Sequence, residues 1–257
     1  MTDRRSIFIT GAASGIGAET ARLFAGRGWQ VGASDVDAAG LASLQQELGA
    51  ERVATFVADV RDFESLERAL ARFTAASRGG LDAIFANAGV LSMGPHPEIT
   101  REQKALMVDV NALGVVHTFD AAFPYLARTP GSHAVAMCST SAEYGAPEHA
   151  VYSATKFFVR GLTEALEVEY RRHGIQVSSI FVAYVQTAMV LDAPVKASSI
   201  ERLGVKVKPG QVAEAVWRAV HGRRLRWRVG LDAHVLNIAA RVLGSRMASL
   251  SAWLTRS

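Results

Sequence analysis

The chain has 257 residues, 49% of them hydrophobic and 20% charged, a balance that excludes an intrinsically disordered protein. Its length suffices for one α/β domain with a sizeable core. The net charge of +4 is modest and predicts no nucleic-acid partner.

Seven short apolar runs are predicted as β-strands. They are continuous runs rich in Val, Ile, Phe and Ala, without polar alternation, which is typical of strands buried on both faces of a parallel sheet. In chain order they cover residues 6–10, 30–34, 53–58, 81–86, 133–138, 176–182 and 226–230.

Helical patterns alternate with these strands. They cover residues 15–28, 38–48, 63–77, 101–127, 152–173 and 210–221. Thr100 and Gln103 form a plausible capping box before the fourth helix. The β-α-β alternation predicts a Rossmann-type, doubly wound parallel sheet of about seven strands with helices on both faces. No linker or repeat interrupts it, so we expect one domain over residues 1–257.

Two segments depart from the alternation. Residues 187–208 contain Pro194 and Gly204 and are followed directly by Pro209. They are predicted as a loop or short-helix excursion beside the strand ends, where open α/β sheets bind ligands. Residues 233–254 carry an amphipathic pattern, and we favour a helix packed on the body or on another subunit over a membrane-surface contact. The apolar stripe of this tail consists of Val235, Ile238, Ala239, Val242, Leu243, Met247, Leu250 and Leu254.

Several features bear on location. Cys138 is the one cysteine, which fits a reducing compartment. We find no secretory signal pattern at the N-terminus and no run of about 18 apolar residues, so we expect a cytoplasmic protein without a membrane span. A basic run near the last strand is interpreted as a solvated edge strand rather than a nucleic-acid or membrane surface. Its arginines are Arg223, Arg224, Arg226 and Arg228.

A glycine-rich loop joins the first strand to the first helix. Glycines there permit a tight turn and a close approach of backbone N–H groups to a phosphate, and the helix N-terminus adds positive potential for a pyrophosphate. The position of the loop in the first β-α-β unit makes a dinucleotide site the preferred reading over an ordinary turn. The loop residues are Thr10, Gly11, Ser14, Gly15, Ile16 and Gly17.

Asp35 lies at the end of the second strand, 18 residues after Gly17. An acid at this place accepts hydrogen bonds from ribose hydroxyls and repels a 2′-phosphate. Ser14 offers no cation for such a phosphate. The sequence therefore favours NAD over NADP. Asp35 could instead cap the next helix, but Asp37 is better placed for that.

Tyr152 and Lys156 open the helix at 152–173, four residues apart and hence on one helical face. A nearby cation lowers a tyrosine pKa, so Tyr152 is a credible general acid/base. Ser139, at the end of the fifth strand, could donate to the substrate oxygen. Ser141 is a weaker rival for that role. We see no histidine or cysteine spacing that predicts a metal site.

These motifs occur together and in one order with Asn87, Ala88 and Gly89 after the fourth strand and Asn111 in the following helix. The combination resembles the short-chain dehydrogenase/reductase family, in its compact single-domain branch, over about residues 7–187. The family resemblance implies an NAD-dependent oxidoreductase in which Ser139, Tyr152 and Lys156 are catalytic.

The resemblance also implies further roles. Asp59 and Val60 match the pair that contacts adenine, and Asn87 matches a residue that braces the sheet near the cofactor. Asn111 matches the residue that holds a water in the proton relay behind Lys156, which in the family also holds the nicotinamide ribose. Val185 and Thr187 match contacts to the carboxamide.

One departure from the family pattern affects the pocket wall. Members often carry Pro-Gly after the sixth strand, where this chain has Val182 and Ala183, followed by Tyr184. We expect cofactor binding to survive with a changed wall. The apolar character of the wall candidates predicts a secondary alcohol or ketone with a partly hydrophobic body. These candidates are Leu91, Ser92, Met93, Gly94, His96, Ala142, Glu143, Tyr144, Ala183, Tyr184 and residues 187–208.

Polar loop residues near the pocket, Glu143 and His149, are interpreted as solvated rather than substrate-binding. Three other functions stay open: an NAD-retaining epimerase or dehydratase, a non-catalytic NAD-binding protein, and membrane-associated lipid or steroid metabolism. By family analogy we expect a homodimer or homotetramer formed through the helices at 101–127 and 152–173.

Overall fold

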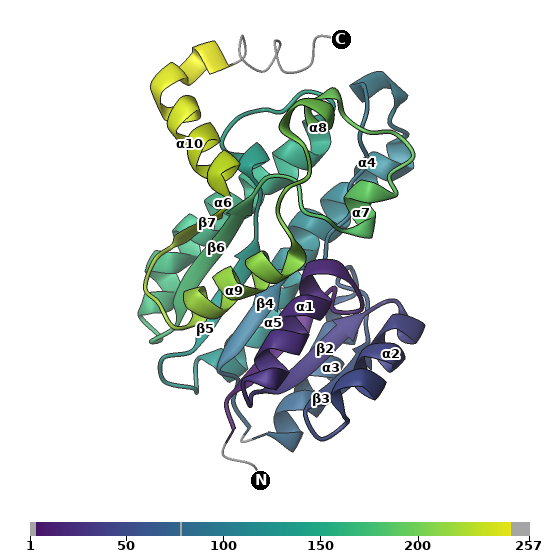
Figure 1. Cartoon of the computed structure of the whole chain (residues 1–257). Helices are drawn as coiled ribbons and strands as arrows, with labels where there is room; N and C mark the ends of the chain where they lie inside the picture. The colour runs from purple at the N-terminus through teal and green to yellow at the C-terminus, as the bar shows by residue number, and fades with distance from the viewer. Residues whose placement is uncertain (1–3, 78, 248–257) are drawn as a thin grey trace.

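The computed structural model describes residues 4–77 and 79–247. Seven parallel strands form one sheet in the order β3-β2-β1-β4-β5-β6-β7 (Figure 1). The order reverses between β1 and β4, which is where doubly wound sheets open a crevice for ligands. The strands are β1 (Ser6–Thr10), β2 (Gln30–Asp35), β3 (Val53–Val57), β4 (Ala83–Ala86), β5 (His133–Met137), β6 (Gln176–Val182) and β7 (Arg226–Val229).

Helices cover both faces of the sheet (Figure 1). One hydrophobic core joins the sheet to α1, α2 and α9, and a second joins it to α3, α5 and α6. Ile7 and Ile9 of β1 belong to the first core and Phe8 to the second, as expected for a strand buried on both faces. The helices are α1 (Gly15–Gly26), α2 (Ala38–Leu48), α3 (Phe63–Ala76), α4 (Arg101–Val108), α5 (Gly114–Leu126), α6 (Ala150–Arg171), α7 (Ala188–Leu191), α8 (Ser198–Leu203), α9 (Pro209–Val220) and α10 (Leu231–Leu243).

The predicted Rossmann-type sheet in a single domain is confirmed. The bounds of β1, β6 and α2 agree with the prediction, and the other strands differ from it by one or two residues. The capping box predicted at Thr100 and Gln103 is present, with both reciprocal hydrogen bonds. The prediction of one helix over 101–127 is wrong in one respect, because a π-helical turn, η2 (Asp109–Leu113), separates α4 from α5.

This composite helix, Arg101–Leu126, is long and apolar enough to cross a membrane by length and composition alone. It packs on the sheet through Val115 and Phe119, as a core helix does. Apolar side chains remain exposed on α4, η2 and α6. They are Leu106, Val108, Leu113, Phe157, Phe158 and Val168. The homo-oligomer expected through these helices stays a prediction.

The segment over residues 187–208 contains two short helices, α7 and α8, which agrees with the short-helix form of the prediction. A small core of its own holds it: Met93 packs with Val190, Ala197 and Ile200. Val185 also pairs with Val207 in an isolated parallel bridge. The segment is therefore fixed beside the carboxyl end of β6, where the prediction places it.

Helix α10 follows the edge strand β7 and protrudes from one end of the sheet (Figure 1). It contacts the body through Ala233 and Leu236. The predicted stripe of Val235, Ile238 and Val242 does not pack on the body, because these side chains are 54%, 60% and 78% exposed. Met247 is buried, whereas Leu250 and Leu254 lie outside the described residues. A contact of the stripe with another subunit stays a prediction.

Candidate active site

A cavity of about 480 Å³ lies at the carboxyl ends of the strands. Most of the site residues predicted from the sequence line it; the three that do not are Thr10, Gly17 and Asn111. The lining residues among the predicted set are Gly11, Ser14, Gly15, Ile16, Asp35, Asp59, Val60, Asn87, Ala88, Gly89, Ser139, Tyr152, Lys156, Val185 and Thr187. The fold thus brings together residues from six strand ends.

The glycine loop leaves no room for side chains. A Cβ on Gly11 would lie 2.7 Å from the Cα of Ala88, and one on Gly17 would lie 2.0 Å from the carbonyl oxygen of Gly11. Gly15 has a φ of +53° and faces the Thr187 methyl group. The Ser14 side chain makes no capping hydrogen bond at the start of α1. The first N–H groups of α1 therefore remain available to an anion.

Asp35 accepts two backbone hydrogen bonds at the end of β2. Its Oδ2 accepts from Ala13 N at 3.0 Å and its Oδ1 from Asp37 N at 3.1 Å. The capping role belongs to Asp37, which accepts from Ala39 and Gly40 at the start of α2. A carboxylate has about four acceptor sites, so Asp35 keeps capacity for two further donors such as ribose hydroxyls.

Asp59 is engaged by a residue that the sequence analysis missed. The Arg61 guanidinium donates to Asp59 Oδ1 at 3.0 Å and to Asp59 Oδ2 at 2.9 and 2.5 Å, and lowers the pKa of that carboxyl. Arg61 lines the cavity as well. Its place directly after the Asp59-Val60 pair is the signal that could have identified it. An adenine contact by Asp59 would have to use the lone pairs that Arg61 leaves free.

Asn87 holds the β1 and β4 loops together. Its Nδ2 donates to the carbonyl oxygens of Thr10 and Gly11, both at 3.0 Å, and its backbone N–H donates to Thr10 Oγ1 at 3.1 Å. Thr10 therefore lies behind the cavity wall, where its hydroxyl fixes the strand end. This arrangement matches the bracing role that the resemblance implies.

Asn111 sits in the π-helical turn η2 and is fully buried. Its Oδ1 accepts from Val90 N and its Nδ2 donates to Val90 O, both at 2.8 Å. Nδ2 also lies 3.4 Å from Thr155 Oγ1 in α6. The widened turn thus carries a side chain that ties the β4 loop to the helix of Tyr152; π-helical turns are frequent at functional sites. The water-holding role behind Lys156 stays a prediction.

Ser139 lies between two hydroxyl groups. Its Oγ accepts from the hydroxyl of Ser141 at 2.9 Å and from the backbone N–H of Ser141 at 3.2 Å. It also hydrogen-bonds to the phenol of Tyr152. The Ser141 hydroxyl therefore supports Ser139. Both serines line the cavity, and the choice of Ser139 as the partner of the substrate oxygen stays a prediction.

Lys156 lies below the Tyr152 ring, with its Nζ 5.5 Å from the ring centroid. Nζ donates to the carbonyl oxygen of Met137 at the end of β5. The side chain is 3% exposed, and burial lowers the pKa of its ammonium. One carbonyl oxygen therefore accepts a hydrogen bond from the buried ammonium, and two of its three N–H donors remain for a ligand.

The pKa of Tyr152 is shifted in the direction opposite to our expectation. Burial of the phenol raises its pKa, and the hydrogen bond with Ser139 lowers it less. Lys156 is not among the groups that shift this pKa; its ammonium donates to the carbonyl oxygen of Met137. In the protein alone, Tyr152 therefore keeps its proton at neutral pH.

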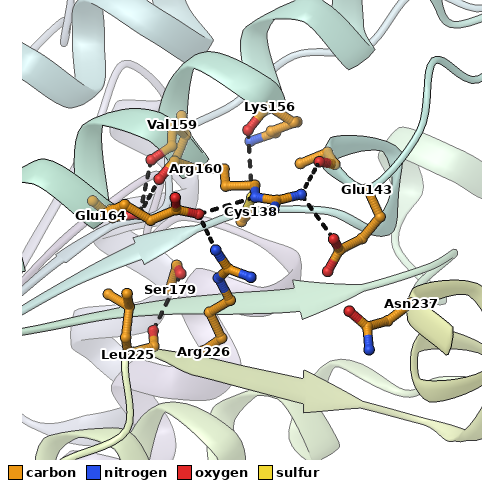
Figure 2. A network of polar contacts seen from close by, with 12 residues as sticks. Cys138, Glu143, Lys156, Val159, Arg160, Glu164, Ser179, Leu225, Arg226 and Asn237 are labelled. Atoms are coloured by element: carbon orange, nitrogen blue, oxygen red, sulfur yellow. Dashed lines mark hydrogen bonds and ion pairs between the residues drawn. The ribbon is translucent and has the colours of Figure 1, made fainter. Parts of the chain in front are cut away.

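A network of charged side chains supports the turn that carries Ser139 (Figure 2). The Arg160 guanidinium donates to the carbonyl oxygen of Ala142 at 3.0 Å and to the Glu143 carboxylate at 2.8 Å. Arg160 also pairs with Glu164 of α6, to which Arg226 of β7 reaches as well. Arg160 lies one turn after Lys156, so α6 fixes both the lysine and the serine turn.

This network corrects two expectations. The Glu143 side chain is only 4% exposed, so it is not a solvated loop residue; nor does it line the cavity. A second arginine, Arg228, donates to Glu143 at 2.9 Å and to Asn237 of α10 at 2.7 Å. Strand β7 is the sheet edge, as predicted, but Arg226 and Arg228 pair inward with acids instead of facing solvent.

The substrate end of the cavity is formed partly by the predicted wall. Leu91, Tyr144, Ala183 and Tyr184 line it, together with α7 residues. His149, expected at the surface, is 4% exposed and lines the cavity too. Met93 lies in the small core below α7 and α8, outside the lining. Within residues 4–77 and 79–247 no group of three His, Cys, Asp or Glu residues could hold a metal ion.

Known proteins are similar to this chain in sequence and in fold. The family profile described as short chain dehydrogenase matches residues 5–196. The oxidoreductase UcpA of Salmonella typhimurium is 33% identical over 224 residues, covering 86% of this chain and 82% of UcpA.

Two solved structures illustrate the similarity in fold. A short-chain dehydrogenase/reductase of Burkholderia phymatum in complex with NAD is 25% identical, with a TM-score of 0.83 and coverage of 96% and 95% of the two chains. An alcohol dehydrogenase of Thermococcus sibiricus, complexed with 5-hydroxy-NADP, is 26% identical, with a TM-score of 0.78 and coverage of 88% and 96%.

Proposed function

The chain belongs to the short-chain dehydrogenase family, and on this premise we propose that it transfers a hydride between NAD(H) and a secondary alcohol or ketone with a partly hydrophobic body. The observation that carries the proposal is the meeting of Ser139, Tyr152 and Lys156 in one cavity with the uncapped start of α1. The nicotinamide supplies the hydride acceptor or donor when bound.

The side chains divide the remaining work in ketone reduction. Ser139 donates a hydrogen bond to the substrate oxygen, where negative charge develops. Tyr152 gives that oxygen its proton, and its raised pKa suits it to be a donor at neutral pH. Lys156, with two N–H donors free, holds ligand hydroxyls below the phenol. For alcohol oxidation Tyr152 must first lose its proton, so oxidation becomes faster as the pH rises.

The preference for NAD over NADP rests on charge at the ribose end. Asp35 lines the cavity there with acceptor capacity left, and exposed Val36 follows it. Within the described part of the chain, the lysine and arginine residues that line the cavity are Arg61 and Lys156. Arg61 is neutralised by Asp59, and Lys156 is buried beneath Tyr152. A 2′-phosphate would therefore meet a carboxylate without a free cation to offset it.

A screen of secondary alcohols with NAD and NADP, and of the matching ketones with NADH and NADPH, tests the proposal. Absorbance of the reduced nicotinamide reports net redox chemistry. We expect turnover with NAD(H), faster for substrates with an apolar body. Substrate conversion without net absorbance change would indicate an epimerase or dehydratase, and NAD binding without any conversion would indicate a non-catalytic protein.

A further inference from the structure

The turn after β6 carries a tyrosine that faces the substrate end of the cavity. Tyr184 lines the cavity and its ring packs against the small core under α7 and α8. Its hydroxyl lies 2.6 Å from Ser199 Oγ and 3.3 Å from His149 Nε2. His149 and Ser199 are 4% and 8% exposed. Three polar side chains from three elements thus converge in an otherwise apolar part of the wall.

The hydrogen bond between His149 and the backbone of Pro147 fixes the directions of the other two hydrogen bonds. His149 Nδ1 lies 3.1 Å from the carbonyl oxygen of Pro147, and a carbonyl oxygen only accepts, so Nδ1 carries a proton. Burial lowers the pKa of His149, so the ring is neutral and Nε2 is an acceptor. Tyr184 must then donate to His149, and Ser199 must donate to Tyr184.

In this series of hydrogen bonds, each of the three polar hydrogens is consequently donated to another group of the protein. Ser199 donates to Tyr184, Tyr184 to His149, and His149 to Pro147. The phenol oxygen keeps one lone pair, because a hydroxyl has two acceptor sites and Ser199 occupies one. A ligand group that reaches Tyr184 finds an acceptor and no donor.

The cluster is held in place by the neighbouring residue. Glu148 has a φ of +61°, an uncommon conformation for a residue with a side chain. Its carboxylate accepts from the backbone N–H of Ser198 at 2.6 Å and from the Ser198 hydroxyl at 3.0 Å. The start of α8, and with it Ser199, is therefore fixed to the segment that precedes Tyr152. The Glu148 charge also favours donors over acceptors nearby.

We propose that Tyr184, oriented by His149 and Ser199, is a specificity-determining residue that accepts a hydrogen bond from a second hydroxyl group of the substrate. The structure therefore points to a diol or hydroxyketone whose second hydroxyl lies a few bonds from the reacting carbon. The His149 ring contacts both phenols, with centroids 6.3 Å from that of Tyr152 and 5.8 Å from that of Tyr184. The imidazole ring of His149 therefore lies between Tyr152, where the substrate reacts, and Tyr184, which would bind its second hydroxyl group.

The test rests on the proposed function and compares probes that differ at one substituent. Cyclohexanol has no second polar group, 4-methoxycyclohexanol adds an acceptor, and cyclohexane-1,4-diol adds a hydroxyl that can donate. The 1,2- and 1,3-diols cover shorter spacings. We expect kcat/KM with NAD to be about tenfold or more higher for the best diol than for its methyl ether and for cyclohexanol, since buried hydrogen-bonding groups discriminate against partners that leave them unpaired.

Tyr184→Phe removes the acceptor and keeps the ring. In this variant kcat/KM for the diol should fall about tenfold further than kcat/KM for cyclohexanol, so that the diol preference is lost. A purely structural role for the hydroxyl would lower both values equally. Tyr170→Phe is the matched control: its pKa is also raised to about 12 by burial, but it packs on Phe123 away from the cavity. It should keep the diol preference.

His149→Phe tests the direction of the hydrogen bonds. Without the imidazole, the Tyr184 proton becomes available, so the methyl ether should approach the diol in kcat/KM. NAD binding followed by fluorescence and the melting temperature establish that each variant is folded. Ser199→Ala is the milder second variant and should keep the preference for a donor.

The outcomes separate the two proposals. Oxidation of cyclohexanol and the diols at equal rates, or an unchanged diol preference in Tyr184→Phe, overturns the inference and leaves the proposed function standing. A preference for the methyl ether over the diol overturns the assigned direction and therefore the inference. Failure of every probe with both cofactors overturns the proposed function for this alcohol class, and the inference with it.

Discussion

The ammonium of Lys156 donates a hydrogen bond to the carbonyl oxygen of Met137 at 3.0 Å, at the point where β5 ends. The lysine is thus held by the strand that leads to Ser139, and its Nζ lies 5.5 Å from the centroid of the Tyr152 ring. This geometry explains why burial, which raises the pKa of Tyr152, outweighs any effect of the cation in the protein alone.

Tyr152→Phe should reduce kcat by about 10²–10⁴-fold on any substrate that the wild-type protein turns over, because it removes the proton donor. The aromatic ring remains, so binding of NADH, measured by fluorescence, should change little. Tyr170→Phe, on the same helix, is the control and should retain normal turnover. Near-normal activity of Tyr152→Phe would refute the assignment.

Asp35→Asn should lower the ratio of kcat/KM for NAD to that for NADP by about tenfold or more, a change of about 1.4 kcal/mol. The amide keeps one acceptor oxygen for the Ala13 or Asp37 N–H but no longer repels a 2′-phosphate. Asp37→Asn, at the cap of α2, should affect the melting temperature alone. An unchanged cofactor ratio in Asp35→Asn would contradict the proposed preference.

Glu143→Gln should destabilise the protein, because two arginines, Arg160 and Arg228, face this buried carboxylate. Removing one partner of a buried ion pair costs about 3 kcal/mol in the free energy of unfolding, to be measured by urea denaturation. We also expect a lower kcat, since Arg160 holds the turn after Ser139. Glu164→Gln is the control; its carboxylate is 39% exposed, so the loss should be below about 1 kcal/mol. Equal losses in the two variants would rule out a special role for Glu143.

Stability should fall as the pH decreases from 7 to 5, through His133. Burial lowers the pKa of this histidine from 6.5 to about 4, and its Nε2 lies 3.0 Å from Ser178 Oγ. Below pH 6.5 the unfolded chain binds a proton that the folded protein does not, so the free energy of unfolding decreases by about 2 kcal/mol at pH 5. His133→Gln should flatten this dependence; His149, shifted in the same direction, retains part of it. A pH profile as steep as that of the wild type would contradict the assignment.

Local patterns were sufficient to predict the strands, because continuous apolar runs are unambiguous in a parallel sheet. The dinucleotide loop and the Tyr152–Lys156 pair were also predictable, since each depends on residues close in the sequence. Glu143 could not be predicted as a buried ion-pair residue. Its partner Arg228 lies 85 residues later in the chain, and the pairing of β5 with β6 and of β6 with β7 brings the two together.

The direction of the Tyr152 pKa shift could not be predicted from the sequence either. The helical spacing of Tyr152 and Lys156 showed that the two side chains share a face, but it gave no information about the Met137 carbonyl that takes the ammonium. Nor did the sequence reveal the hydrogen bonds of Tyr184, because α8 reaches it only after the chain has folded into the small core around Met93.

The π-helical turn at Asp109–Leu113 changes the phase of the side-chain directions between α4 and α5. A π turn accommodates one residue more than an α turn, and each residue of an α-helix advances the facing direction by about 100°. A helical wheel drawn through from Arg101 to Leu126 would therefore assign the faces of α5 about one residue out of phase. Deleting a single residue such as Ala112 would rewind the turn into a regular α turn and withdraw the Asn111 amide from Val90.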